Sequence, residues 1–592
     1  MFSRRALLIG GGAAALAGPA IARGAQDAAL VQLLSRHMDE HLALSPEAAA
    51  SILSDARGRA ARGRLDDRSP AGKAAQVSAA RRWRSELARL QPAALSPTRR
   101  MDYDTAAFAY EMLAEVGARY GFQDHALRPG PYVVNQMAGA YYWQPQAFAR
   151  SPMSTREDAD LYLARLAAFA TVLDGEVASI RADAATGVAP PDFVLDRTLR
   201  QLSDLRASAA QSLLESPARR ATQAGLGDVP AAAGATVERQ VIPALDRQMA
   251  ALQALRPAAS GEAGVWRLPD GDAWYALALR SNTTVATSPE AMHRLGLETF
   301  EALRAELDLR LRAQGLTQGP VGARIQALDR DPRQLKPETD AGRAEILQFA
   351  REHLPRLYGL LPRAFRTLPD RDVTVDRIPV AIEAGAPGAY YDGPPADGSR
   401  PGIISINLKT TAEWPTWRLK TLLHHEGDPG HHLQHAVFRR AGGADQPLYK
   451  QFAQYSAYVE GWALYAEQVA VEIGAYENDP FGEIGALQSA LFRAARIVVD
   501  TGIHHKRWSR AQATRWMVEN AGEQPASAQR EIDRYCVYPG QACAFMVGRL
   551  ELLNTREAAR RRLGAAFDVR DWHEAVLAAG PMPMEVLARN FA

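Results

Sequence analysis

Apolar residues recur at intervals of three and four along most of this sequence, which is the period of helices with one buried face. Clusters of proline and glycine, such as Pro129–Gly130–Pro131 and Pro190–Pro191, separate the periodic segments. We expect residues 26–260 to form one helical lobe that builds a wall of a cleft, because no chemical constellation is recognisable there. Its predicted helices are Ala29–Met38, Ser45–Ala60, Ser78–Leu90, Thr105–Glu115, Glu157–Ala182, Asp192–Leu214 and Ala235–Leu255.

The pattern changes in the second predicted lobe, residues 261–592. Ser288 and Pro289 are typical of a helix start, so we expect a long helix from there to about Ala313. A small sheet (373–408) then precedes helices over 416–473. Its predicted strands are the β-branched runs Val373–Val375, Ile378–Ile382 and Gly402–Leu408, with Gly385–Gly402 as a loop that holds Tyr390 and Tyr391.

The predicted fold class is therefore mainly α, a large two-lobed helical fold with a small β-sheet next to a histidine-rich helix. In a peptidase, the edge of such a sheet can hold an extended peptide.

The first 22 residues have the character of a twin-arginine export signal. Arg4 and Arg5 precede an apolar run rich in glycine and alanine, and Ala20–Ala22 is a small-residue cleavage site. The run is shorter than the 18 or so apolar residues that a span needs, which makes a membrane anchor the less favoured alternative. We expect a periplasmic or secreted protein with no stable membrane span after signal removal.

Charge and cysteine content add little chemistry of their own. Removing residues 1–22 deletes two arginines and no acid, so the formal net charge falls from +2 to zero. No basic patch is evident, and we expect no nucleic-acid partner. Cys536 and Cys543 could form one disulfide in an oxidising compartment, but on one regular helix they would lie two turns apart, too far to bond.

Five of the thirteen histidines lie within residues 424–435. His425–Glu426 followed by His431 has the residue types of a zinc peptidase site, in which imidazoles hold the ion and the glutamate activates water. The usual spacing, H-E-x-x-H, fails here because the residue four after His425 is Pro429. Pro429 and Gly430 predict a break in the helix over Gly427–Gly430 that returns His431 to the side of His425.

Other interpretations of the histidines stay open at this point. His431 and His435 are four apart and could pair on a regular helix without His425. His432 is a second alternative to His431 as a ligand. The cluster could also consist of hydrogen-bonded imidazoles that bind no metal.

A predicted helix, Tyr449–Ile473, places Glu460 and Glu467 on one apolar face. Buried carboxylates need a partner, and a metal or a histidine would supply one. We favour Glu460 over Glu467 as the third ligand, with ordinary ion-paired acids as the alternative. Gly461 inside this helix predicts the close approach of another backbone.

Arg493, Arg496, Asp500 and His504 form a polar stripe on a later predicted helix, in which Arg496 and Asp500 have the spacing of an ion pair. A histidine or a tyrosine can donate a hydrogen bond to the oxyanion formed when a carbonyl is attacked. His504 and Tyr538 are the candidates for that role.

Several segments together, in the same order, resemble a family of bacterial exported proteins catalogued as domain of unknown function 885, over roughly residues 30–590. The segments are Leu268–Gly271, Thr283–Thr284, His293–Gly296, Tyr390–Tyr391, His425–Gln434, Glu460–Glu467, Asp500–His504 and Tyr538–Ala542.

That family in turn resembles the helical zinc peptidases that include angiotensin-converting enzyme, thimet oligopeptidase and the thermostable carboxypeptidases. Those enzymes use H-E-x-G-H and a glutamate from a later helix. Aligning the Gly-His-x-Leu ends places Gly430–Leu433 on this pattern, with two extra residues before it, and implies His431 rather than His432 as the second ligand.

The sequence thus predicts a zinc-dependent peptide hydrolase of the cell envelope that acts on a peptide or small amide. His425, His431 and Glu460 would hold one Zn²⁺, Glu426 would be the general base, and His504 and Tyr538 would stabilise the oxyanion. The alternatives are a non-catalytic envelope binding protein on a degenerate peptidase scaffold and a hydrolase of another amide or ester.

Overall fold

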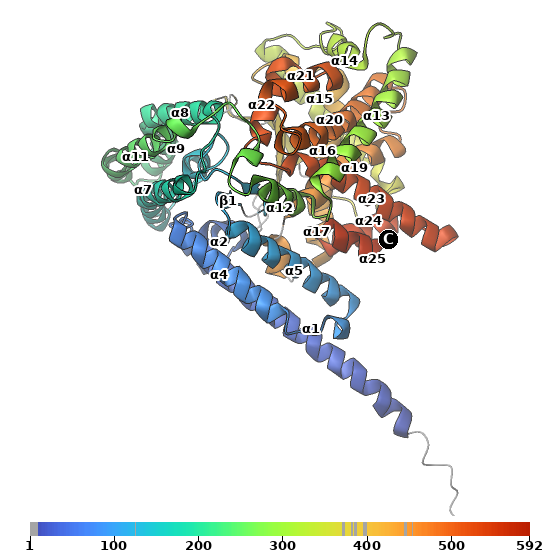
Figure 1. Ribbon diagram of the computed structural model, residues 1–592, viewed down its shortest axis with the longest axis horizontal. Helices are drawn as coiled ribbons and strands as arrows, with labels where there is room; N and C mark the ends of the chain where they lie inside the picture. Colours follow the sequence, from blue (N-terminus) through green and yellow to red (C-terminus); the bar gives the residue numbers. More distant parts are fainter. Residues whose placement is uncertain are drawn as a thin grey trace, which may run out of the picture.

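The computed structural model describes residues 10–592 apart from 125, 370–372, 381, 382, 384–387, 395–399, 443–446 and 453. Arg4 and Arg5 of the predicted export signal lie outside the described residues. Helices make up 71% of the chain and strands are few, which confirms the mainly α fold class (Figure 1). In the part of the chain that the structure describes, no helix is long and apolar enough to cross a membrane.

The N-terminal half is built from eleven described helices and one short hairpin. The helices are α1 (Gly10–Leu44), α2 (Pro46–Ile52), α3 (Ala56–Ala61), α4 (Pro70–Leu87), α5 (Pro97–Gly117), α6 (Ala140–Arg150), α7 (Arg156–Ala185), α8 (Asp192–Ala207), α9 (Ala209–Gln223), α10 (Val229–Thr236) and α11 (Ile242–Gln253). Strands β1 (Phe122–Gln123) and β2 (Pro129–Gly130) pair in antiparallel fashion. A π-helical turn, Val237–Val241, joins α10 to α11.

Helices α6 to α11 form a bundle around their own apolar core, which includes Phe148, Phe169 and Leu245. In Figure 1 the helices α7, α8, α9 and α11 stand to one side of the later helices. Helix α5 belongs elsewhere, because its Phe108 and Met112 share a core with α19 and the C-terminal helices. The first 260 residues therefore contribute to several separate cores.

The C-terminal half contains fourteen described helices. They are α12 (Gly271–Thr283), α13 (Pro289–Ala313), α14 (Val321–Asp329), α15 (Asp340–Tyr358), α16 (Thr416–Glu426), α17 (His431–Gly442), α18 (Leu448–Phe452), α19 (Ser456–Glu472), α20 (Pro480–His504), α21 (Arg510–Ala521), α22 (Pro525–Tyr535), α23 (Gln541–Leu563), α24 (Val569–Ala579) and α25 (Met584–Phe591). The predicted start of α13 is confirmed, since the Ser288 side chain accepts a hydrogen bond from the amide of Ala291.

The small sheet contains β3 (Val373–Arg377), β4 (Ala389–Asp392) and β5 (Gly402–Ile406), in the order β3-β5-β4. Strand β5 is central, parallel to β3 and antiparallel to β4. The prediction of a strand over Ile378–Ile382 is wrong for residues 378–380, which lie beyond the end of β3, and residues 381 and 382 lie outside the described residues. The predicted Gly385–Gly402 loop contains β4, because Tyr390 and Tyr391 pair with β5.

One face of the sheet positions α16, the first of the histidine-bearing helices. Ile404 and Ile406 of β5 pack in one apolar core with Leu419 and Leu423 of α16. These α16 residues lie four apart, as one face of a helix requires.

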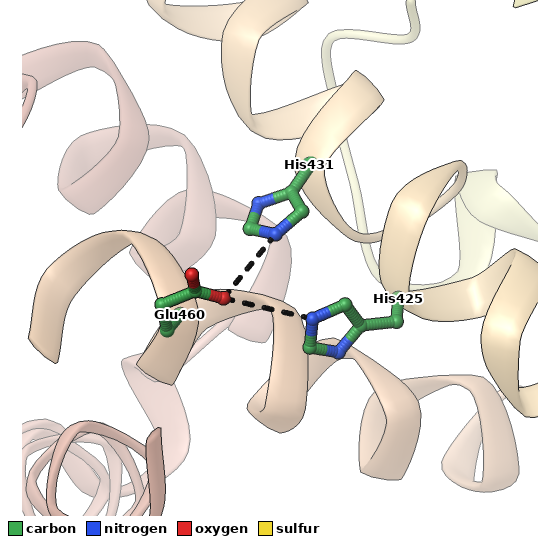
Figure 2. A group of neighbouring side chains, drawn as sticks. All are labelled: His425, His431 and Glu460. Atoms are coloured by element: carbon green, nitrogen blue, oxygen red, sulfur yellow. Dashed lines mark ion pairs between the residues drawn. The ribbon is translucent and has the colours of Figure 1, made fainter. Parts of the chain in front are cut away.

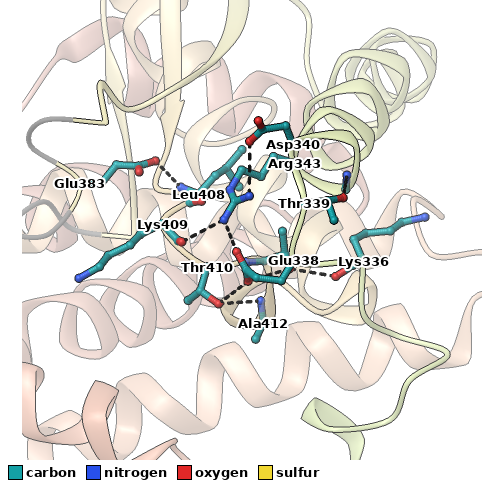
Figure 3. A network of polar contacts seen from close by, with 12 residues as sticks. Lys336, Glu338, Thr339, Asp340, Arg343, Glu383, Leu408, Lys409, Thr410 and Ala412 are labelled. Carbon is teal, nitrogen blue, oxygen red and sulfur yellow. Dashed lines mark hydrogen bonds and ion pairs between the residues drawn. The ribbon is translucent and has the colours of Figure 1, made fainter.

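A polar network fixes the connection from β5 to α16 (Figure 3). The Glu338 carboxylate accepts hydrogen bonds from the Thr410 hydroxyl at 2.7 Å and from the Thr411 amide at 2.8 Å. Arg343 of α15 donates to the Leu408 carbonyl at 2.9 Å and forms an ion pair with Glu338. Because this chain runs directly into α16, the network also limits where that helix begins.

Helices α19 and α23 touch through their backbones. A Cβ added to Gly461 would lie 2.5 Å from the Cα of Gly548, and one added to Gly548 would lie 1.9 Å from the Ala457 carbonyl oxygen. The close approach predicted at Gly461 is confirmed.

Candidate metal centre

The predicted helix break is confirmed, because α16 ends at Glu426 and α17 begins at His431. A Cβ on Gly430 would lie 1.9 Å from the His425 carbonyl oxygen, so the returning chain passes where only glycine fits. From α19, the Trp462 indole donates to the Pro429 carbonyl at 3.0 Å. The break is thus anchored to the helix that carries the two glutamates.

The break brings His425 and His431 together with Glu460 of α19 (Figure 2). The Glu460 Oε2 atom lies 3.7 Å from His425 Nε2 and 3.6 Å from His431 Nε2. One potential ligand atom from each residue lies within 4.8 Å of those of the other two. Exposure increases from 6% for the His425 side chain to 12% for His431 and 25% for Glu460, so solvent reaches the group from the Glu460 side.

Glu467, the alternative to Glu460 as the third ligand, does not lie with the three potential ligand atoms. Its Oε1 atom lies 2.8 Å from Nδ1 of His425, on the opposite side of the ring from Glu460. A carboxylate there fixes the tautomer of His425 with the proton on Nδ1, which leaves the Nε2 lone pair for a metal. The spacing of seven between Glu460 and Glu467 signalled a shared face, but it did not distinguish the two roles.

The histidines and the glutamates of the centre each change the pKa of the other. Burial opposes a charge on His425, but Glu460 and Glu467 together raise its pKa to about 9. Burial likewise opposes a charge on Glu460, and His425 and His431 hold its pKa well below the usual range. The centre therefore keeps its carboxylate ionised and attracts positive charge.

The other histidines of the cluster have different neighbours. His432 forms a hydrogen bond of 3.0 Å through Nδ1 with the Tyr391 hydroxyl of β4, so it faces the sheet. The His435 ring also lies near Tyr391, at 5.7 Å between ring centroids, and burial lowers its pKa to about 4. His424 binds the Tyr476 hydroxyl at 2.9 Å. Neither the His431–His435 pair nor His432 forms the group with Glu460.

Glu426 is buried at the last position of α16, and its charge contributes to the raised pKa of His425. Within the described ranges it makes no hydrogen bond or ion pair. Its carboxylate therefore remains available as a proton acceptor beside the centre.

His504 does not have the role predicted for it. Its Nδ1 accepts a hydrogen bond of 3.2 Å from the Val265 amide, and its Nε2 lies 3.0 Å from the Tyr535 carbonyl, to which it donates. With both ring nitrogens bound to backbone, no donor is left for an oxyanion. Burial also lowers the His504 pKa to about 4, which removes the charged form near neutral pH.

The predicted role of Tyr538 requires a hydroxyl that can donate a hydrogen bond to the oxyanion. Its ring lies under the Arg128 guanidinium at 5.5 Å, and its hydroxyl has no hydrogen bond within the part of the chain that the structure describes. Arg128 donates to the Asp124 carboxylate at 2.7 Å, and the more distant charge of Glu460 also acts on it.

The predicted Arg496–Asp500 ion pair is absent from the described residues. Asp500 instead accepts hydrogen bonds from the Tyr275 hydroxyl at 2.6 Å and from the Gly540 amide at 3.0 Å. Burial raises its pKa to about 7. Cys536 and Cys543 are both buried and free.

Comparisons with known proteins support the family resemblance. A family model described as bacterial protein of unknown function (DUF885) matches residues 46–591. A solved structure from Colwellia psychrerythraea, described as a lipoprotein, is 32% identical, with a TM-score of 0.90 over 96% of this chain and 98% of that chain. One from Shewanella oneidensis, described as a lipoprotein of unknown function, is 17% identical, with a TM-score of 0.70 over 95% and 99%.

The second likeness concerns the fold alone, and no curated protein matches this chain. The lipoprotein description of the Colwellia protein is consistent with an exported or envelope protein. Neither solved structure is described as a peptidase, so the resemblance to zinc peptidases stays a prediction.

Proposed function

Since the chain belongs to the DUF885 family of bacterial proteins of unknown function, we propose from the site itself that it is a zinc-dependent peptide hydrolase of the cell envelope. One observation carries the proposal. The Nε2 atoms of His425 and His431 converge on one Glu460 oxygen, while Glu467 holds the far side of the His425 ring.

The donor set fits Zn²⁺. Two imidazole nitrogens and one carboxylate oxygen are ligands of catalytic zinc sites, which keep a further position for water or substrate. The partial exposure of Glu460 leaves room for that position. The Glu467–His425 contact is the carboxylate–histidine arrangement that orients zinc ligands in proteins.

When bound, zinc would supply Lewis-acid chemistry by polarising the substrate carbonyl and making water acidic enough to react near neutral pH. Glu426 would take a proton from the attacking water and pass it to the leaving amine. The Tyr538 hydroxyl would donate to the developing oxyanion. The Trp462 indole donates to the Pro429 carbonyl and so helps to fix the helix break that positions His431. Glu467 holds the His425 ring through its Nδ1 atom.

Metal analysis of the purified protein, combined with a screen of defined peptides with and without a chelator, tests the proposal. We expect about one zinc per chain and cleavage that stops with the chelator and returns with zinc. Metal-free protein, or peptide cleavage that a chelator leaves unchanged, would contradict it. If the protein holds zinc but cleaves no peptide, the result would favour a non-catalytic binding protein or a hydrolase of another amide or ester.

Glu426→Gln separates catalysis from metal binding. We expect it to keep its zinc and to lose roughly 10²- to 10⁴-fold in turnover, because an amide cannot accept the proton. Glu301→Gln, at an exposed position of α13, is the matched control and should behave as wild type. Full activity in Glu426→Gln would show that this residue is not the general base.

A further inference from the structure

Two arginines of α20, the buried Arg496 and the half-buried Arg493, have no polar partner among the described residues. Arg496 is 2% exposed, and its Nε and Nη2 atoms are buried with no hydrogen bond. The Nε atom of Arg493 is in the same condition. Among the described residues, neither guanidinium forms a hydrogen bond or an ion pair. Such groups are costly to bury, since each guanidinium carries five N–H donors.

Several other buried or half-buried arginines of the described residues form ion pairs, among them the buried Arg324 with Asp308. Arg418, for example, donates to the Asp329 carboxylate at 2.8 Å. Arg377 forms a two-pronged contact with Glu383, at 2.7 and 2.8 Å. The α20 pair therefore departs from the pattern that this fold uses for structural arginines.

Aromatic rings take the place of acidic partners. The Arg496 guanidinium lies 4.1 Å from the centroid of Phe545, and that of Arg493 lies 5.7 Å from it. Tyr535 lies 5.4 Å from Arg496 on another side. Cation–π contacts hold the charges in position but leave the N–H groups in the guanidinium planes unused.

The same aromatic ring adjoins the metal centre. Phe545 stacks against His425, with ring centroids 6.3 Å apart and planes at 17°. The charge of Glu460 acts on both arginines, and that of Glu531 does so as well. Neither acid lies within ion-pair distance of them, and Glu531 accepts a hydrogen bond from the Tyr535 hydroxyl at 2.8 Å. The unpaired donors thus lie beside the proposed zinc ligands.

We propose that Arg493 and Arg496 bind the free α-carboxylate of the substrate. This inference rests on the proposed function and names its substrate class. The planar guanidinium fork matches a carboxylate, and a pair of such forks favours an anion over a neutral group. A peptide carries its α-carboxylate at the C-terminal end, which is the side of the leaving amine. The enzyme would then release short fragments or single residues from C-termini.

An equimolar pool of tripeptides, prepared once as free acids and once as C-terminal amides, tests the proposal. Retention of each peptide by Glu426→Gln, measured by ultrafiltration and mass spectrometry, reports binding without turnover. Cleavage of the same pools by zinc-loaded wild type reports activity. We expect the acids to be favoured roughly 10- to 100-fold, the range for hydrogen bonds to charged groups. Equal retention and equal cleavage of acids and amides would overturn the proposal.

Variants identify the residues. Arg496→Met, placed in the Glu426→Gln background, should lower retention of the acids toward that of the amides and leave the amides and the zinc content unchanged. Arg496→Lys should be intermediate, because lysine keeps the charge but loses the fork. Arg310→Met removes an exposed charge that pairs with Glu483 of α20 and should change neither pool. An equal loss of acids and amides in Arg496→Met would contradict the assignment.

The two proposals fail in different ways. If the acids are retained preferentially but no peptide is cleaved, carboxylate binding by the two arginines is supported and the hydrolase proposal is wrong. If cleavage is sensitive to the chelator but shows no preference for acids, the hydrolase proposal is supported and carboxylate binding is wrong. If Arg496→Met does not fold, Arg493→Met and the wild-type comparison of acids with amides still decide the question.

Discussion

The buried charges around Glu176 and those around Glu460 use their polar atoms differently. Glu176, in the N-terminal bundle, is fully buried, and its two oxygens accept hydrogen bonds of 2.8 Å from the Ala140 amide and the Gln248 side chain. Arg68 lies 3.7 Å away. This cluster joins α6, α7 and α11 and leaves neither Glu176 oxygen unbonded.

Around Glu460 the ion-pair distances are 3.6 and 3.7 Å, longer than direct hydrogen bonds. His431 Nδ1 and two nitrogens of Arg496 are buried without partners. A buried carboxylate whose two oxygens are both hydrogen-bonded has little capacity left for a ligand, whereas one that faces two imidazoles at longer range keeps that capacity. Both clusters contain a buried charge and unsatisfied polar atoms, among them Gln248 Oε1 in the Glu176 cluster. They differ in the carboxylate itself, because both Glu176 oxygens are hydrogen-bonded and Glu460 Oε2 faces the two imidazoles at 3.6 and 3.7 Å.

We expect the largest effect from substitutions of the proposed metal ligands. His425→Ala and Glu460→Ala should each weaken zinc binding by more than the roughly 10- to 100-fold expected when only an orienting group is lost. Zinc retained during dialysis against a competing chelator is the measurement. Glu176→Gln, which changes the fully buried acid of the other cluster, should keep its zinc. Wild-type affinity in either ligand variant would remove the distinction between the clusters.

Glu176 should instead make the free energy of unfolding depend on pH. Burial raises its pKa to about 7, so between pH 4.5 and 7 the folded state holds a proton that the unfolded state has released. Stability from this group therefore falls as pH rises through that window. Relative to Glu176→Gln, wild type should lose about 3 kcal/mol of unfolding free energy across it. Denaturant unfolding at several pH values measures this, and parallel pH profiles would contradict the raised pKa.

Glu467 should have an intermediate effect on zinc. Glu467→Gln weakens the carboxylate that orients His425, so we expect zinc affinity to fall roughly 10- to 100-fold. Glu472→Gln, further along α19 and paired with Arg556, is the control and should keep wild-type affinity. If Glu467→Gln loses zinc as completely as Glu460→Ala, then Glu467 is itself a ligand.

The smallest effect concerns the anchor of the helix break. Trp462→Phe leaves the Pro429 carbonyl without its indole donor, which should cost about 1 kcal/mol of unfolding free energy. Urea unfolding of metal-free protein measures the loss. Trp143→Phe, at an exposed position, should be neutral. An unchanged free energy in Trp462→Phe would show that water replaces the indole.

Local chemistry explains which features the sequence predicted. Pro429 and Gly430 break the helix through their own backbones, and the shared face of Glu460 and Glu467 follows from helical spacing. What escaped prediction depends on distant partners. His504 is bound by Val265, Asp500 by Tyr275 and Gly540, and β4 exists because Tyr390 and Tyr391 pair with β5. No local pattern in the chain encodes those pairings.

The backbone contact of Gly461 with Gly548 has a consequence for how this family can vary. Gly461 adjoins the proposed ligand Glu460. Gly548 lies one turn beyond Phe545, whose ring packs against the guanidinium groups of Arg493 and Arg496. No rotamer change can absorb an added methyl group between two backbones, so a larger residue at either position would shift the proposed metal site against the proposed carboxylate site. We therefore expect positions 461 and 548 to covary among relatives, and relatives that lose both glycines to differ in the length of the fragment they release.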